Sequence, residues 1–139
     1  MGTSLLNDDI ICVSPKDFID GPNTPGQPRV TAFENEGMWA GITTVIAKGS
    51  PSQWHHHADH DSVMYMLSGQ IRVDWGEDGE KSFTMAPGDF AFFKRGVIHP
   101  AEVILGDEDI RFVAVRVGKG ETVINVDGPG SNVDVSSFE

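Results

Sequence analysis

Short runs of residues along this chain alternate between apolar and polar positions with a period of two. The clearest run is Gln70 to Trp75, in which every second side chain is apolar. A turn-rich segment, Gly76 to Gly79, follows it, and a second run passes through Phe83 and Met85. Because the side chains of a β-strand point alternately to its two faces, this pattern predicts two strands joined as a hairpin.

The same spacing recurs over most of the chain, with glycine, proline or acidic turns between the runs. Further strands are predicted at Arg29 to Phe33, Met38 to Ala47, Gln53 to His57, Val63 to Leu67, Phe90 to Lys94, Pro100 to Leu105, Ile110 to Val117 and Glu121 to Val126. No long helix is expected. Roughly eight to ten short strands predict an all-β barrel or jelly roll, an architecture that protects the edges of a small sheet.

The length of 139 residues, or 15.1 kDa, fits one compact domain. We expect this domain to span residues 1–126. The segment Asp127 to Glu139 is rich in Gly, Ser, Asn and Asp and is predicted to be a flexible tail. A second loop is predicted at Asp20 to Pro28, which contains three prolines and two glycines.

Acidic side chains outnumber basic ones by 21 to 10, so the formal net charge is −11. This charge repels phosphate backbones and anionic membranes, which argues against nucleic acid and membrane partners and leaves a small molecule. The segment Met1 to Val13 has no basic region typical of a secretory signal. Cys12, the single cysteine, is predicted to be a packed core thiol in a cytoplasmic protein.

The histidines carry the chemical signal of the sequence. Four of the five lie within six residues, at His55, His56, His57 and His60, and the fifth is His99. On a strand, His55 and His57 share one face while His56 points to the other. Two imidazoles on one face form half a metal site. His56 is expected to be exposed to solvent or hydrogen-bonded.

The glycines around these histidines resemble the first motif of the cupin family. Gly49, five residues, His55, one residue, His57 and then Gly69 reproduce a His-x-His pair that one glycine precedes and another closes. The motif spans residues 49–69.

A second cupin motif is similar to residues 88–103. Pro87 and Gly88 introduce it, and seven residues then lead to Gly96 and two more to His99. Together the motifs identify the chain as resembling a single-domain cupin, which implies a double-stranded β-helix (jelly-roll) barrel. The resemblance also implies one divalent transition metal held by His55, His57 and His99.

The sequence departs from the family at the usual fourth ligand. A glutamate normally follows the second histidine by four or five positions, and this chain has Ser62 there, preceded by Asp61. In the second motif, Lys94 replaces the usual proline and Val103 the usual asparagine. Three neutral imidazoles leave the full divalent charge on a metal, so such a centre favours an anionic ligand.

Several neighbouring side chains are candidates to complete the site. His60 and Asp61 are predicted either as a fourth ligand, as a general acid or base, or as ordinary turn residues. Gln53, on the strand face of His55, is a candidate ligand or outer-shell amide, as is Ser62, although Gln53 also fits an ordinary polar strand position.

The strand after Ser62 predicts the wall of a substrate cavity. If the inward register continues, Met64 and Met66 line the cavity with an apolar, adaptable surface. Phe90, Phe92 and Phe93 belong to the opposing motif, and at least one is expected to face inward. Phe90 and Phe92 are assigned to the predicted cavity, although such residues also commonly belong to a core.

Imidazole ligands suit Fe(II), Zn, Ni, Mn and Cu, so ligand type alone does not fix the ion, and Fe(II) is favoured only by the family resemblance. A three-histidine site without the glutamate resembles non-haem iron dioxygenases that cleave diketones or thiols, and also polyketide cyclases with an all-histidine zinc site. We therefore expect a dioxygenase for a small apolar or aromatic substrate that chelates through oxygen. The alternatives are a zinc-type cyclase or isomerase and a non-catalytic metal- or ligand-binding cupin.

Small jelly rolls commonly pair through exposed strands, so a homodimer is expected. The segments Ile10 to Val13 and Arg29 to Phe33 are the predicted contacts, because each could join the sheet of a partner.

Overall fold

The described part of this computed structural model comprises residues 9–22, 27–46, 55–56, 59–98, 103–119 and 124–125. Apart from a 3-10 turn at Pro15–Asp17, all regular structure in these ranges is β-strand. The predicted all-β fold is therefore confirmed. No helix in the described ranges is long and apolar enough to cross a membrane.

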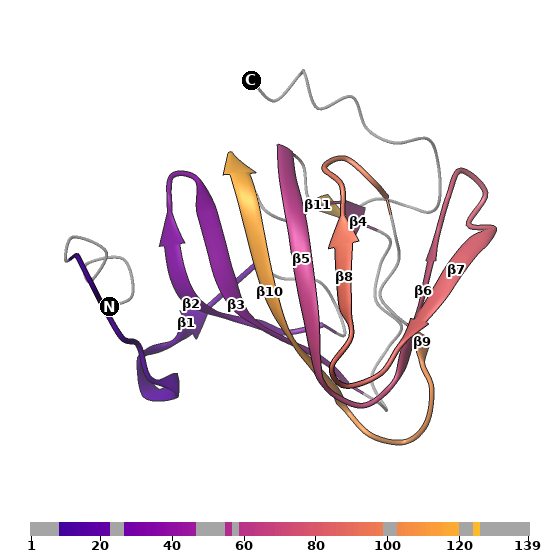
Figure 1. Ribbon diagram of the computed structural model, residues 1–139, viewed down its shortest axis with the longest axis horizontal. Coiled ribbons are helices and arrows are strands. Elements are labelled where there is room, and N and C mark those ends of the chain that lie inside the picture. Colours follow the sequence, from indigo (N-terminus) through magenta and orange to yellow (C-terminus); the bar gives the residue numbers. More distant parts are fainter. Residues whose placement is uncertain are drawn as a thin grey trace.

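The strands assemble into three antiparallel sheets (Figure 1). The six-stranded sheet has the order β1-β2-β3-β10-β5-β8, the three-stranded sheet the order β7-β6-β9, and the two-stranded sheet pairs β11 with β4. Their bounds are β1 Ile19–Asp20, β2 Arg29–Asn35, β3 Met38–Val45, β4 His55–His56, β5 Asp59–Ser68, β6 Ile71–Trp75, β7 Lys81–Met85, β8 Phe90–Phe93, β9 Val103–Ile104, β10 Ile110–Lys119 and β11 Ile124–Asn125.

Burial alternates along the central strands of the six-stranded sheet, so the sheet has an inner and an outer face. One hydrophobic core lies between its inner face and the three-stranded sheet. The six-stranded sheet contributes Trp39, Val45, Met64, Met66, Phe93, Ile110, Phe112 and Ala114, and the smaller sheet contributes Ile71, Val73 and Met85. This sandwich is the predicted jelly roll.

The predicted hairpin is the β6–β7 pair, in which Ile71 lies opposite Met85 and Trp75 opposite Lys81. The backbone N–H of Gly79 donates to the carbonyl oxygen of Gly76 at 3.1 Å and closes the turn. The ammonium of Lys81 lies 4.6 Å from the centre of the Trp75 ring and adds a cation–π contact across the strands. Sequence periodicity was sufficient here because one face is buried and the other exposed.

Gly69 joins β5 to β6 at a position that requires glycine. Its φ of +77° lies in the left-handed region, and a Cβ there would collide with Cδ1 of Ile110, a fully buried core residue. The turn thus brings the chain from the large sheet to the small one in close contact with the core.

Two local predictions are wrong. β5 begins at Asp59, so His60 lies in a strand and not in the preceding turn. Cys12 is exposed rather than packed in the core. The segment Ile10 to Val13 forms no strand within the chain and Ile10 is exposed, and its contact with a partner stays a prediction. The predicted tail, residues 127–139, lies outside the described residues.

Candidate functional site

The histidine-rich segment enters the fold through β4. His55 and His56 pair with Asn125 and Ile124 of β11, and Figure 1 shows this small sheet close to the end of the molecule where β5 begins. Only the backbone of His55 is described. Gln53, His57 and His99 lie outside the described residues, so the predicted three-histidine ligand set stays a prediction.

Two histidine side chains are described, and both are buried. His56 lies in β4 and His60 on the inner face of β5. Burial lowers the pKa of His56, because removal from water disfavours the charged imidazolium. A neutral imidazole has one nitrogen lone pair for a metal ion or a hydrogen bond. The expectation of an exposed His56 is wrong, whereas a hydrogen-bonded one remains compatible with its burial.

Ser62 follows His60 on the inner face of β5, at the position where the family usually has glutamate. It lies opposite Phe93 of β8 on one side and opposite Arg116 of β10 on the other. Ser62 is only 3% exposed, and among the described residues its hydroxyl has no hydrogen-bond partner. Buried hydroxyls are normally satisfied, so this unsatisfied oxygen needs an explanation.

Met64 and Met66 continue the inner face beyond Ser62 and are fully buried in the core. They occupy the inward positions that the strand register predicts. Their contact with a substrate stays a prediction. On this side of the site, therefore, the described wall of β5 is hydroxyl and thioether, with no carboxylate.

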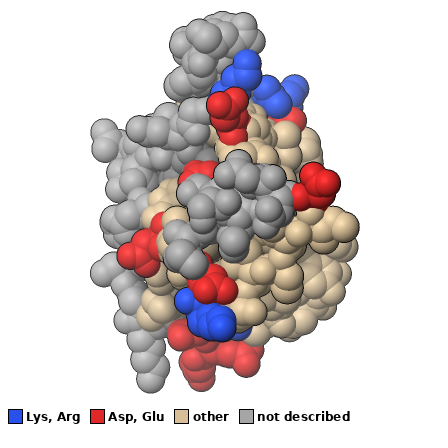
Figure 2. Space-filling model, turned by 90° about the vertical axis from the view of Figure 1, so that its left-hand side faces the viewer, with Lys and Arg blue, Asp and Glu red and all other residues tan. Residues whose placement is uncertain are grey.

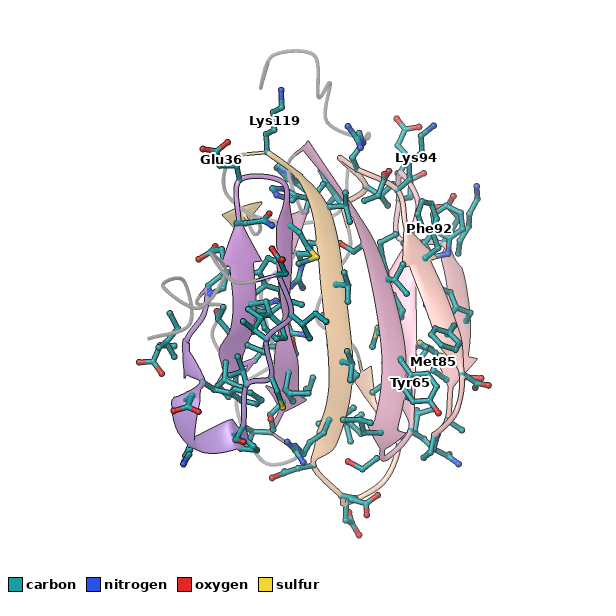
Figure 3. The ribbon with its side chains drawn as sticks, turned by 60° about the vertical axis from the view of Figure 1, so that its left-hand side comes forward. Glu36, Tyr65, Met85, Phe92, Lys94 and Lys119 are labelled. Carbon is teal, nitrogen blue, oxygen red and sulfur yellow. The ribbon has the colours of Figure 1, made fainter. Side chains whose placement is uncertain are left out.

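Phe90 and Phe92 do not line the interior, contrary to prediction. They are 72% and 64% exposed on the outer face of β8, whereas Phe93 is 8% exposed and joins the core. Tyr65 covers one side of Phe90, with ring centres 4.6 Å apart, and Figure 3 shows Phe92 and Tyr65 on the outer side of the sheet. The sequence FAFF alternates ambiguously, since a β-strand can bury either the first and third residue or the second and fourth.

Asp61 also faces outward, because it alternates with His60 and Ser62 along β5. Its carboxylate accepts hydrogen bonds from the backbone N–H of Arg95 at 3.0 Å and from the guanidinium Nη2 at 3.2 Å. These bonds hold the pKa of Asp61 below its ordinary value. We therefore reassign Asp61 from a candidate ligand or acid–base group to a structural ion pair.

Arg116 is a buried cation that the sequence reading overlooked. It is 3% exposed on the inner face of β10, and its Cζ lies 4.7 Å from the centre of the Trp39 ring. A signal was present, because Arg116 continues the inward alternation of Ile110, Phe112 and Ala114. Charged residues are rarely buried fully, so composition alone places such a side chain at the surface.

Comparison with known proteins agrees with this architecture. Residues 42–116, more than half of the chain, match the family described as "Cupin domain". The chain belongs to the cupin family. Among curated proteins, no significant match to this cupin is found.

Solved structures confirm the cupin fold. The polyketide cyclase RemF from Streptomyces resistomycificus superimposes with a TM-score of 0.66 at 19% identity, over 84% of this chain and 85% of RemF. An uncharacterized double-stranded β-helix protein from Klebsiella pneumoniae gives 0.64 at 18% identity, over 87% and 99%. The cupin domain of Schizosaccharomyces pombe Cnp3 gives 0.59 at 17%, over 70% of this chain and 65% of that domain. At these identities the likeness concerns the fold.

Within the described ranges, no three His, Cys, Asp or Glu side chains gather as a metal site would require. The chemistry of the neighbouring donors nevertheless fits a neutral, imidazole-based centre. His60 is a buried imidazole on the inner face of β5, and Ser62, two residues further on, is a neutral residue where the fourth ligand usually lies. A metal held by the predicted His55, His57 and His99 would have no carboxylate from this wall.

Proposed function

We propose that this cupin is a metal-dependent enzyme acting on a small substrate that chelates through oxygen. The predicted ligands are His55, His57 and His99, which the family motifs single out. The observation that carries the proposal is Ser62, a buried neutral residue with an unsatisfied hydroxyl at the position of the usual glutamate. With no carboxylate there, an anionic substrate would supply the charge that offsets the metal.

The residues around Ser62 suit such a substrate. Phe93 lies opposite Ser62, and Met64 follows it on the same face, so apolar side chains exclude water beside the hydroxyl. The Ser62 hydroxyl is available to donate a hydrogen bond to a substrate oxygen. A divalent ion in the site would supply Lewis acidity and, if it is iron, a path for electrons between substrate and dioxygen.

Two reaction classes follow, and the iron-dependent dioxygenase is our first choice. A non-redox cyclase or isomerase with zinc is the second choice. The structural likeness to the polyketide cyclase RemF supports this alternative. The protein should be loaded separately with Fe(II) and Zn(II) and incubated with diketones, thiols, catechols and linear polyketide analogues. Oxygen uptake and product mass then separate the two classes.

Oxygen uptake with iron alone would support the dioxygenase. A product of unchanged mass with zinc would support the cyclase or isomerase. Binding without turnover under either metal would overturn an enzymatic role and favour a ligand-binding cupin. Arg72→Lys is the control, because Arg72 pairs with Asp74 at 2.9 Å on the exposed face of β6.

We also propose that the protein forms a homodimer through the outer face of its six-stranded sheet. Val63, Leu67, Phe90, Phe92 and Val117 are all exposed there, and we call them the outer apolar face. Uncharged residues cover most of the right-hand side of the molecule in Figure 2. The adjacent Asp61 and Arg95 neutralise each other, so this face adds little to the −11 charge that would oppose self-association.

A further inference from the structure

The inner face of the six-stranded sheet carries a row of four side chains that crosses the strands near the start of β5. Phe93 of β8, Ser62 of β5, Arg116 of β10 and Trp39 of β3 lie directly opposite one another in successive strand pairs. All four are buried. A buried guanidinium therefore lies next to a buried hydroxyl inside the barrel, because residues directly opposite one another on one face are in contact distance.

Trp39 holds the Arg116 guanidinium in a defined position. The indole N–H of Trp39 donates to the hydroxyl oxygen of Thr31 at 2.8 Å, which fixes the ring plane, and Arg116 lies over that ring at 4.7 Å. A cation over an aromatic face is attracted by the ring itself, and this contact does not use the N–H groups that lie in the guanidinium plane. The stack therefore orients the donors of Arg116.

Two polar atoms of this row lack hydrogen bonds among the described residues. They are the Ser62 hydroxyl and the Nη1 atom of Arg116, whose guanidinium has other interactions. Leaving buried polar atoms unsatisfied is costly, so each such atom calls for an explanation such as a bound water, ion or ligand. Both atoms can donate, so the ligand they fit presents acceptor oxygens.

The second buried arginine of the sheet, Arg29, lies opposite Thr43, and its Nε and the Thr43 hydroxyl also lack hydrogen bonds among the described residues. Arg29 donates through Nη2 to the side-chain oxygen of Gln27 at 3.0 Å and through Nη1 to the carbonyl oxygen of Pro22 at 3.3 Å. Both ends of its guanidinium thus donate to neutral oxygens of the protein itself, which fits a structural role. Arg116 instead adjoins Ser62, the residue to which the proposed substrate site is assigned.

We propose that Arg116 and Ser62 bind the carboxylate of the substrate, so that the substrate class is a small organic acid. The inference rests on the proposed function and names the substrate of that same site. A planar carboxylate has two oxygens, which match one guanidinium N–H and one hydroxyl. Apolar Phe93 and Met64 adjoin the pair and suit the hydrocarbon part of the acid.

Calorimetry with chelator-treated protein tests this site without the metal. The ligands are acetate and benzoate, with acetamide and benzamide as neutral isosteres and inorganic phosphate as a second anion. We expect a carboxylate to bind and its amide to bind at least about tenfold more weakly, because a charged acceptor is lost. The indole N–H signal of Trp39 in nuclear magnetic resonance spectra should shift on binding.

Three variants locate the binding. Ser62→Ala should weaken carboxylate binding about fivefold through loss of one hydrogen bond. Arg116→Lys should weaken it about tenfold or more, because lysine cannot present the planar pair of donors. Arg72→Lys, on the surface, should bind like wild type. Thermal unfolding confirms that each variant is folded, and Ser62→Ala, the smaller change, decides the test if Arg116→Lys does not fold.

The inference is overturned if no carboxylate binds, if phosphate binds as well as a carboxylate, or if binding is unchanged in folded Ser62→Ala and Arg116→Lys. Failure of the proposed function is separately visible. If the protein holds no metal but binds carboxylates through these two residues, the metal enzyme is wrong and the carboxylate site stands. If the protein holds metal but Ser62→Ala and Arg116→Lys bind carboxylates like wild type, the carboxylate site is wrong and the metal enzyme stands.

Discussion

The two faces of the six-stranded sheet are made by the same strands, yet their chemistry differs sharply. On β5, His60, Ser62, Met64 and Met66 face inward and are buried, while Val63 and Leu67, at alternate positions, are about 40% exposed. The inner face thus combines a packed core with a few buried polar groups at one end. The outer face combines exposed apolar side chains with a neutralised ion pair.

This difference separates two kinds of function. Buried polar side chains with unsatisfied atoms indicate a site for a small ligand inside the barrel. Exposed apolar side chains in a contiguous patch indicate a surface that associates with another protein. Because side chains alternate along a strand, the same strand can place a ligand site on one face of the sheet and an interface on the other.

The largest contrast is expected between Met66 and its neighbour Leu67. Met66→Ala should lower the free energy of unfolding by about 2–5 kcal/mol, because it opens a cavity in the core. Leu67→Ala, on the exposed face, should cost below about 1 kcal/mol when measured in monomeric protein. Urea unfolding measures both values. Equal costs would contradict the assignment of the two faces.

The proposed homodimer gives the next largest effect. Phe92→Glu places a charge within the outer apolar face and should weaken dimerisation at least about 100-fold, or about 2.7 kcal/mol. Leu105→Glu is the matched control, since Leu105 is exposed beyond β9, outside this face. Light scattering after size-exclusion chromatography gives the mass. A monomeric wild type, or a dimer that survives Phe92→Glu, would contradict this interface.

Substitutions of Trp39 and Trp75 compare a buried with a partly exposed tryptophan, and their expected effects on stability are smaller. Trp39→Phe removes the indole donor from the buried Thr31 and should cost about 1–3 kcal/mol. Trp75→Phe changes a partly exposed residue whose ring contacts Lys81 and should cost less than about 1 kcal/mol. Thermal or urea unfolding gives the difference. If Trp75→Phe loses more stability than Trp39→Phe, the hydrogen bond from Trp39 to Thr31 does not stabilise the inner face as described.

The smallest effect concerns Asp61. Because Arg95 lowers the pKa of Asp61 in the folded protein, the pair stabilises the fold above the ordinary pKa of 3.8, and this contribution is lost as pH falls through the lower folded value. Both side chains are about a third exposed, so Asp61→Asn should cost at most about 1 kcal/mol near pH 7.

Unfolding of wild type and Asp61→Asn should be compared between pH 7 and pH 3. The two stabilities should converge toward the acid end, as wild-type Asp61 becomes protonated. A difference that is constant with pH would contradict the ion pair. Loss of metal or turnover in Asp61→Asn would restore Asp61 as a site residue.

Much of the fold followed from local sequence pattern. Ile71, Val73 and Trp75 alternate cleanly, so the β6–β7 hairpin was predictable. The same logic placed Met64 and Met66 inward. It failed for Phe90 and Phe92, because both faces of β8 carry aromatic residues and the sequence does not show which face the core covers.

Less of the candidate site was predictable, because its contacts are distant in sequence. The bond from Arg95 to Asp61 spans 34 positions and depends on the β5–β8 register. The approach of Arg116 to Ser62 depends on the β5–β10 register in the same way. Arg116 is also buried, whereas charged residues usually lie at the surface. The histidine cluster from His55 to His60 was visible because its four histidines lie close together in the sequence.

The most direct test of the metal centre is the metal content of the untagged protein as isolated, measured by elemental mass spectrometry. We expect close to one transition-metal ion per chain, with iron favoured, and its loss in His55→Ala and His99→Ala, whereas Arg72→Lys retains it. Circular dichroism shows whether the two histidine variants keep the fold. No bound metal in wild type, even after reconstitution with Fe(II) and Zn(II), would contradict the proposed enzyme.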